Sequence, residues 1–91
     1  MANIALVDDE QSILTSVSLS LESEGFKVDT FLNGVEALKA LETKSYDLGL
    51  FDIKMPKMDG NELLTKVRAS KAKNLKELPI IFLTSKDHEQ D

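Results

Sequence analysis

Residues 46–60, with the sequence YDLGLFDIKMPKMDG, hold the stretch that decides the fold of this chain. Residues 46–51 form a short, largely apolar run of the kind that builds a buried strand, and Asp52 follows it directly. The residues after Asp52 contain Pro56 and end at Gly60, and proline and glycine at such positions are typical of a loop. The stretch therefore predicts a strand, a carboxylate at its end, and a loop that leads into the next element.

Two further apolar runs are followed by polar side chains in the same way. Residues 4–7 precede Asp8 and Asp9, and residues 80–83 precede Thr84. If the three runs are parallel strands, their polar residues gather at the carboxyl edge of one sheet, where open α/β sheets bind ligands. Crowded carboxylates repel one another, so such a cluster favours a hard cation such as Mg²⁺.

The segments between these runs alternate between helix and strand patterns. Residues 11–24, 34–43 and 61–70 have the spacing of amphipathic helices, residues 26–31 are typical of a more polar strand near an edge, and residues 71–78 indicate a polar connector. The side chains expected to face the core of the three helices are Ile13, Leu14, Val17, Leu21, Val35, Leu38, Leu41, Leu63, Leu64 and Val67. This order predicts an α/β fold with a parallel sheet, right-handed crossovers and helices on both faces.

The composition bounds the class of protein. A chain of 91 residues with 42% hydrophobic and 30% charged residues is typical of one globular domain. The absence of cysteine excludes disulfides and thiolate chemistry, and a net charge of −5 argues against nucleic-acid binding by this chain alone. The apolar runs are too short to cross a membrane, and the N-terminus enters the first strand with no room for a signal peptide, so we expect a cytoplasmic protein without membrane contact.

The residues at the predicted sheet edge suggest phosphate chemistry. Asp52, at the end of the most central strand, could act as a nucleophile that forms an acyl phosphate beside a divalent cation. Asp9 would add a second carboxylate, Asp8 a third through water, and the backbone carbonyl of Lys54 a further oxygen ligand. The hydroxyl of Thr84 could donate to a phosphoryl oxygen, although a threonine after a strand is more often a cap or turn residue.

Three motifs resemble the receiver domain of two-component response regulators. They are Val7-Asp8-Asp9-Glu10, the loop sequence of residues 51–60, and Leu83-Thr84-Ser85. The resemblance covers the whole chain. In detail, the sequence is similar to ChvI-type regulators of the OmpR/PhoB class. It implies a flavodoxin-like (CheY-like) doubly wound parallel sheet with strand order 2-1-3-4.

The resemblance also implies a signalling switch and not a conventional enzyme. Asp52 would accept a phosphoryl group from the phosphohistidine of a sensor histidine kinase, and Mg²⁺ would be held by Asp9, Asp52 and the Lys54 carbonyl, with Asp8 in the outer shell. The remaining roles it implies are reading of the phosphorylated state by Thr84 and Ser85, shaping of the loop by Pro56 and Gly60, and kinase contacts by Ile13, Leu14 and neighbouring serines.

The chain departs from this family at its C-terminus. It ends at Asp91, before the family's fifth strand, the lysine that pairs with the phosphoryl group, and the fifth helix. We therefore expect residues 1–91 to be a receiver domain truncated before strand 5, in a longer transcriptional regulator whose output domain binds DNA. The strand at residues 80–83 would then be an apolar edge, which favours a homodimer or a strand-swapped oligomer.

Three other hypotheses are compatible with the sequence. A receiver-like interaction module could act without phosphorylation. A haloacid-dehalogenase-type phosphatase would carry a second acid two residues after the nucleophile, where this chain has Lys54. A flavodoxin-like FMN binder would need a phosphate loop after the first strand, where the acids at positions 8–10 would repel phosphate.

Overall fold

A four-stranded parallel sheet forms the centre of the molecule. The computed structural model describes residues 2–55 and 57–83. In the order β2-β1-β3-β4, the strands are β2 (Lys27–Phe31), β1 (Asn3–Val7), β3 (Leu48–Asp52) and β4 (Ile80–Leu83). This order confirms the predicted 2-1-3-4 topology and makes β1 and β3 the two central strands.

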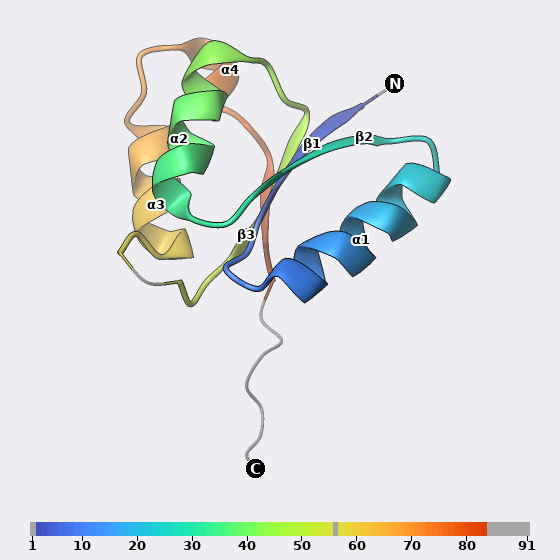
Figure 1. Cartoon of the computed structure of the whole chain (residues 1–91). Helices are drawn as coiled ribbons and strands as arrows, with labels where there is room; N and C mark the ends of the chain where they lie inside the picture. The colour runs from blue at the N-terminus through green and yellow to red at the C-terminus, as the bar shows by residue number, and fades with distance from the viewer. Residues whose placement is uncertain (1, 56, 84–91) are drawn as a thin grey trace.

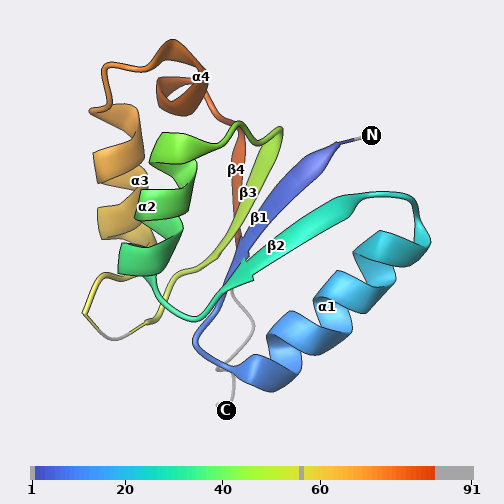
Figure 2. The same cartoon turned by 45° about the horizontal axis from the view of Figure 1, so that its top comes forward.

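The helices cover both faces of this sheet, as the alternating pattern predicts. Helix α1 (Gln11–Ser23) lies on one face, and α2 (Gly34–Thr43) and α3 (Gly60–Arg68) lie side by side on the other (Figures 1 and 2). Gly25 follows α1 with a φ of 98°, the left-handed region that glycine adopts readily at helix ends. None of the helices in the described part of the chain has the length and apolar composition needed to cross a membrane.

Strand β1 contributes to a separate apolar core on each face of the sheet. Ile4 and Leu6 pack with Leu14 of α1, whereas Ala5 and Val7 pack under α2 and α3. Alternate residues of a strand point to opposite faces, so a strand covered on both sides is apolar throughout. This explains why the sequence shows β1 as a continuous apolar run, and it places the acids after Val7 at the end of a rigid element.

One predicted orientation and one predicted contact on the helices are wrong. Val35 was expected to face the core but is 39% exposed, because α2 turns Gly34, Ala37 and Leu41 toward the sheet and leaves Leu38 half-buried. Leu14 faces the core, as its position on the helix predicts, and its exposure of only 1% excludes the kinase contact that the resemblance implies for it. The buried residues follow the spacing of one helical face, and Val35 lies outside that face.

The connector at residues 71–78 is more ordered than the sequence suggests. It contains a short helix, α4 (Lys73–Lys76), and both Leu75 and Leu78 are buried in the core beneath α2 and α3. The Arg68 guanidinium on α3 donates from Nη1 to the carbonyl oxygens of Lys76 at 2.9 Å and Leu78 at 2.8 Å. These bonds satisfy the last carbonyl of α4 and a second carbonyl in the segment that leads into β4.

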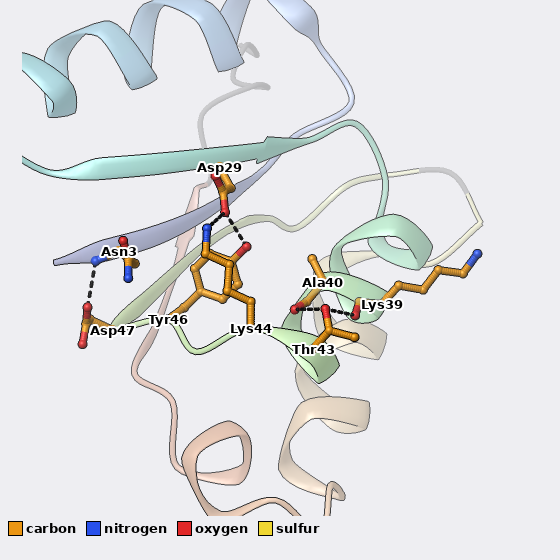
Figure 3. A network of polar contacts seen from close by, with 8 residues as sticks. All are labelled: Asn3, Asp29, Lys39, Ala40, Thr43, Lys44, Tyr46 and Asp47. Atoms are coloured by element: carbon orange, nitrogen blue, oxygen red, sulfur yellow. Dashed lines mark hydrogen bonds and ion pairs between the residues drawn. The ribbon is translucent and has the colours of Figure 1, made fainter.

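Tyr46 also lies outside the strand that was predicted to contain it. Its hydroxyl donates to Asp29 Oδ2 at 2.6 Å, and Lys44 Nζ donates to the same oxygen at 2.7 Å, so the chain before β3 is tied to β2 (Figure 3). The hydrogen bonds from Lys44 and Tyr46 lower the pKa of Asp29, while burial and the bond to Asp29 raise the pKa of Tyr46. Strand β3 begins only at Leu48.

Candidate functional site

The three acids singled out in the sequence meet at the carboxyl edge of the sheet. Asp8 and Asp9 directly follow β1, and Asp52 is the last residue of β3, its neighbour in the sheet. One carboxylate oxygen from each acid lies within 4.8 Å of the other two. The parallel pairing of β1 with β3, in which Val7 lies opposite Phe51, therefore assembles a single cluster from distant parts of the chain.

The members of this cluster differ in burial. Asp8 is 1% exposed and Asp52 is 2% exposed, whereas Asp9 is open to solvent. Asp8 Oδ1 accepts a hydrogen bond from the backbone N–H of Glu10 at 2.9 Å, and Asp52 Oδ1 accepts one from that of Lys54 at 3.2 Å. Buried carboxylates require such partners, and these bonds hold both carboxylates in place before any ligand binds.

The cluster has the donor set of a hard cation. Three carboxylates offer only oxygen, and Mg²⁺ is bound in proteins by one or two carboxylates together with carbonyl oxygens, water and substrate oxygens. The exposed Asp9 leaves one side of the cluster accessible to an incoming group, while Asp8 and Asp52 form its floor. The residues present therefore fit a hard divalent cation such as Mg²⁺.

Gly60 gives the loop after Asp52 its path. A Cβ at this position would lie 2.5 Å from the carbonyl oxygen of Asp52 and 3.0 Å from the Cα of Ile53. The Gly60 N–H donates to the Ile53 carbonyl at 3.0 Å, which closes the loop on itself. Only glycine allows this approach of α3 to the backbone that carries Asp52, so Gly60 has the geometry of a loop-shaping residue.

The loop is also fixed from below and at its end. Met55 and Met58 are each 8% exposed and pack into the core, so they act as anchors and not as ligands. Asp59 caps α3 by accepting from the backbone N–H of Glu62 at 2.9 Å. Between the anchors, Lys57 has a φ of 68°, a left-handed backbone that non-glycine residues adopt only when the surroundings impose it.

Some predicted site residues fall outside the described part of the chain, and one contact was missed. Pro56, Thr84 and Ser85 lie outside the described residues, so their predicted roles stay predictions. The missed contact joins Gly34, at the start of α2, to the loop residue Met58. The Asn33-Gly34 pair indicates a turn, but no local pattern could reveal which distant segment that turn would touch.

Comparison with protein families gives one match over nearly the whole chain. The model of the response regulator receiver domain matches residues 4–91. Among curated proteins, the chain is 43% identical over 88 residues to the alkaline phosphatase synthesis transcriptional regulatory protein PhoP of Bacillus subtilis. That match covers 97% of this chain and 35% of PhoP, so the chain spans about a third of the length of this relative.

Solved structures show the same fold. The chemotaxis protein CheY4 of Vibrio cholerae superimposes with a TM-score of 0.88 at 35% identity, covering 97% of this chain and 72% of that one. The response regulator TrrA of Thermotoga maritima, solved in complex with Mg²⁺ and BeF, gives a TM-score of 0.86 at 40% identity, covering 97% of this chain and 73% of that one. These identities support a shared family and not only a shared topology.

Proposed function

Because this chain belongs to the response regulator receiver domain family, we propose that it acts as a phosphorylation-dependent switch in which Asp52 is the phosphoacceptor. The observation that carries the proposal is the cluster of Asp8, Asp9 and Asp52, which lies at the carboxyl edge of the sheet with Asp52 on its floor. A receiver domain is a signalling module, so the group transfer at Asp52 changes the state of the domain itself.

The chemistry follows from the positions of the three acids. A carboxylate oxygen of Asp52 attacks the phosphorus of a phosphohistidine on a sensor histidine kinase, the P–O bond forms, and the P–N bond breaks. The departing imidazole keeps the electron pair and takes up a proton. Mg²⁺, when bound, would offset the negative charge that the phosphoryl group brings to a carboxylate cluster.

Each remaining residue has a role in this proposal. Asp9, Asp52 and the Lys54 carbonyl would hold the metal, and Asp8 would act on it through water. Thr84 and Ser85 read the phosphorylated state, and Pro56 and Gly60 shape the loop beside the site. The support lies in the carboxylate geometry, in the close approach of Gly60 to Asp52, and in TrrA, a relative that was solved with Mg²⁺ and BeF.

The whole protein would carry this switch to an output. PhoP is a transcriptional regulatory protein about three times as long as the matched segment, so we place the chain as the receiver part of a transcriptional regulator with DNA contacts made elsewhere.

Strand β4 ends the described sheet with Ile81 55% exposed, an apolar edge suited to a homodimer or strand-swapped oligomer. A cytoplasmic location accords with phosphoryl transfer from a sensor kinase.

Intact mass spectrometry tests the assignment of Asp52. The chain is incubated with Mg²⁺ and a small-molecule phosphodonor, beside Asp52→Ala and the control Glu42→Gln, which removes one exposed surface charge far from the cluster. We expect one added phosphoryl group on the wild type and on Glu42→Gln, and none on Asp52→Ala. Equal labelling of Asp52→Ala would refute the assignment.

A result with no label on any variant needs a second measurement. The same incubation is then repeated on a chain extended beyond residue 91. Labelling of the longer chain alone would place a required group beyond this segment. Absence of labelling there too would favour an interaction module that acts without phosphorylation.

A further inference from the structure

We propose that Gly34 is a positioning residue for the site, because its missing side chain lets the first turn of α2 bear directly on the loop between β3 and α3. The proposal rests on the proposed function, since that loop supplies the Lys54 carbonyl to the metal. Gly34 is buried and is the first residue of α2. A Cβ at position 34 would lie 2.9 Å from the Met58 carbonyl oxygen and 3.1 Å from both Cβ and Cγ of Met58.

The backbone of Gly34 does not itself require glycine. Gly25 is the only glycine in the described chain with a positive φ, so an alanine at position 34 could keep the same helical backbone. Alanine also has a better helix propensity than glycine. Local conformation therefore gives no reason for glycine here, and the contact with Met58 does.

Neither side of this contact can easily move away. On the α2 side, Asn33 Oδ1 accepts from the backbone N–H of Glu36 at 2.9 Å and fixes the start of the helix. On the loop side, Met58 is 8% exposed in the core, and the next residue, Asp59, caps α3. A side chain at position 34 would therefore push on a backbone carbonyl between two fixed points, which differs from pushing on the end of a flexible side chain.

The displacement would travel from Met58 to the site along a short path. Two residues after Met58, Gly60 has no room for a Cβ beside the carbonyl oxygen of Asp52, and its N–H donates to the carbonyl of Ile53. The N–H of Lys54 in turn donates to Asp52 Oδ1 at 3.2 Å. A shift of the loop at Met58 would thus alter the position of the Lys54 carbonyl and of the Asp52 carboxylate together.

The experiment compares two glycine substitutions that differ in their distance from the site. Gly34→Ala introduces the clash with Met58. Gly25→Ala is the matched control, because its φ of 98° strains the fold while its Cβ meets nothing within 4 Å. Mg²⁺ affinity is measured by titration calorimetry, and protection of the Lys54 and Gly60 amides is measured by hydrogen exchange without metal.

We expect Gly34→Ala to weaken Mg²⁺ binding by about tenfold, the lower end of the range for groups that orient metal ligands, and to reduce protection of both amides. Gly25→Ala should lower stability but leave Mg²⁺ affinity and both amides unchanged. Adding Met58→Ala to Gly34→Ala removes one of the clashing atoms and should restore part of the affinity. Should Gly34→Ala not fold, the double variant takes its place, and we then expect Mg²⁺ binding and amide protection below those of the wild type, because the Met58 carbonyl oxygen and Cβ still meet the added side chain.

The two readouts separate this inference from the proposed function. If the wild type binds Mg²⁺ and Gly34→Ala binds it equally well with the same amide protection, the role of Gly34 is refuted while the metal site stands. If the wild type does not bind Mg²⁺, the metal site fails. The amide protection then still decides whether Gly34 positions the loop.

Discussion

The acid cluster consists of two buried carboxylates and one exposed carboxylate. This difference in burial gives the three side chains different freedom to move. Asp8 and Asp52 are held by backbone N–H groups and have little freedom, while Asp9 can follow an arriving ion. Pre-organised oxygen ligands reduce the conformational entropy lost on metal binding. The sequence predicted this cluster because each acid directly follows an apolar strand, which is a local pattern. The Gly34–Met58 contact joins the start of α2 to a distant loop and leaves no such pattern.

Gly60 gives a test of close packing at a single residue. Gly60→Ala would place a methyl group 2.5 Å from the Asp52 carbonyl oxygen, so we expect a loss of roughly 1–3 kcal/mol in the free energy of unfolding. Urea denaturation measures this loss, with the exposed neighbour Asn61→Ala as the control. A Gly60→Ala variant as stable as the control would show that α3 can retreat from Asp52 at little cost.

Asp29 gives a test of charge at a single residue. Its pKa lies below the usual 3.8, because Lys44 and Tyr46 donate hydrogen bonds to its carboxylate. A lowered pKa stabilises the fold above pH 3.8, and this stabilisation is lost as the pH falls through the lower pKa of the folded state. Asp29→Asn should therefore be less stable than the wild type at pH 7, by up to about 1 kcal/mol since the pair is half-exposed, with little difference near pH 2.

Urea unfolding across this pH range measures the effect of Asp29. Glu42→Gln, an exposed acid on α2, is the control and should follow the wild type at every pH. A constant gap between Asp29→Asn and the wild type down to pH 2 would assign the effect to packing and not to charge.

The helices and strands that could be predicted are those whose own sequence shows which residues are buried. The ends of β1, α1 and α2 agree with the sequence to within a residue, because apolar runs and turn residues mark them. Helix α4 could not be predicted, since a four-residue helix in a lysine-rich connector has no measurable periodicity. Leu75 and Leu78 are the large apolar residues of this connector, and they are buried only because the connector packs into the core with α2 and α3.

Arg68 tests whether α4 depends on tertiary support. Arg68→Met keeps an apolar stem but removes both bonds to the Lys76 and Leu78 carbonyls. We expect a loss of roughly 1–2 kcal/mol in the free energy of unfolding and faster hydrogen exchange at residues 75–78. Lys66→Met, on the exposed surface of α3, is the control and should change neither quantity. Equal exchange in the two variants would mean that buried leucines alone hold α4.

For the whole molecule, we expect metal binding to raise the stability of the folded chain against unfolding. An ion that binds only the folded chain raises the free energy of unfolding by about 2.7 kcal/mol at a concentration of 100 times its Kd. Thermal unfolding with increasing Mg²⁺ should therefore give a rising Tm for the wild type and a much smaller rise for Asp9→Asn, with choline chloride matching the ionic strength. An identical rise in both proteins would place the stabilising ion away from the acid cluster.

Strands β1 and β3 are neighbours in the sheet but far apart in the sequence, and this separation sets when the acid cluster can form during synthesis. Asp8 and Asp9 leave the ribosome early, whereas Asp52 follows only after the intervening helices and β2 have emerged. A nascent chain that stops before β3 carries two of the acids but not the cluster. A partner that needs all three carboxylates would therefore find its site only after β3 has paired with β1.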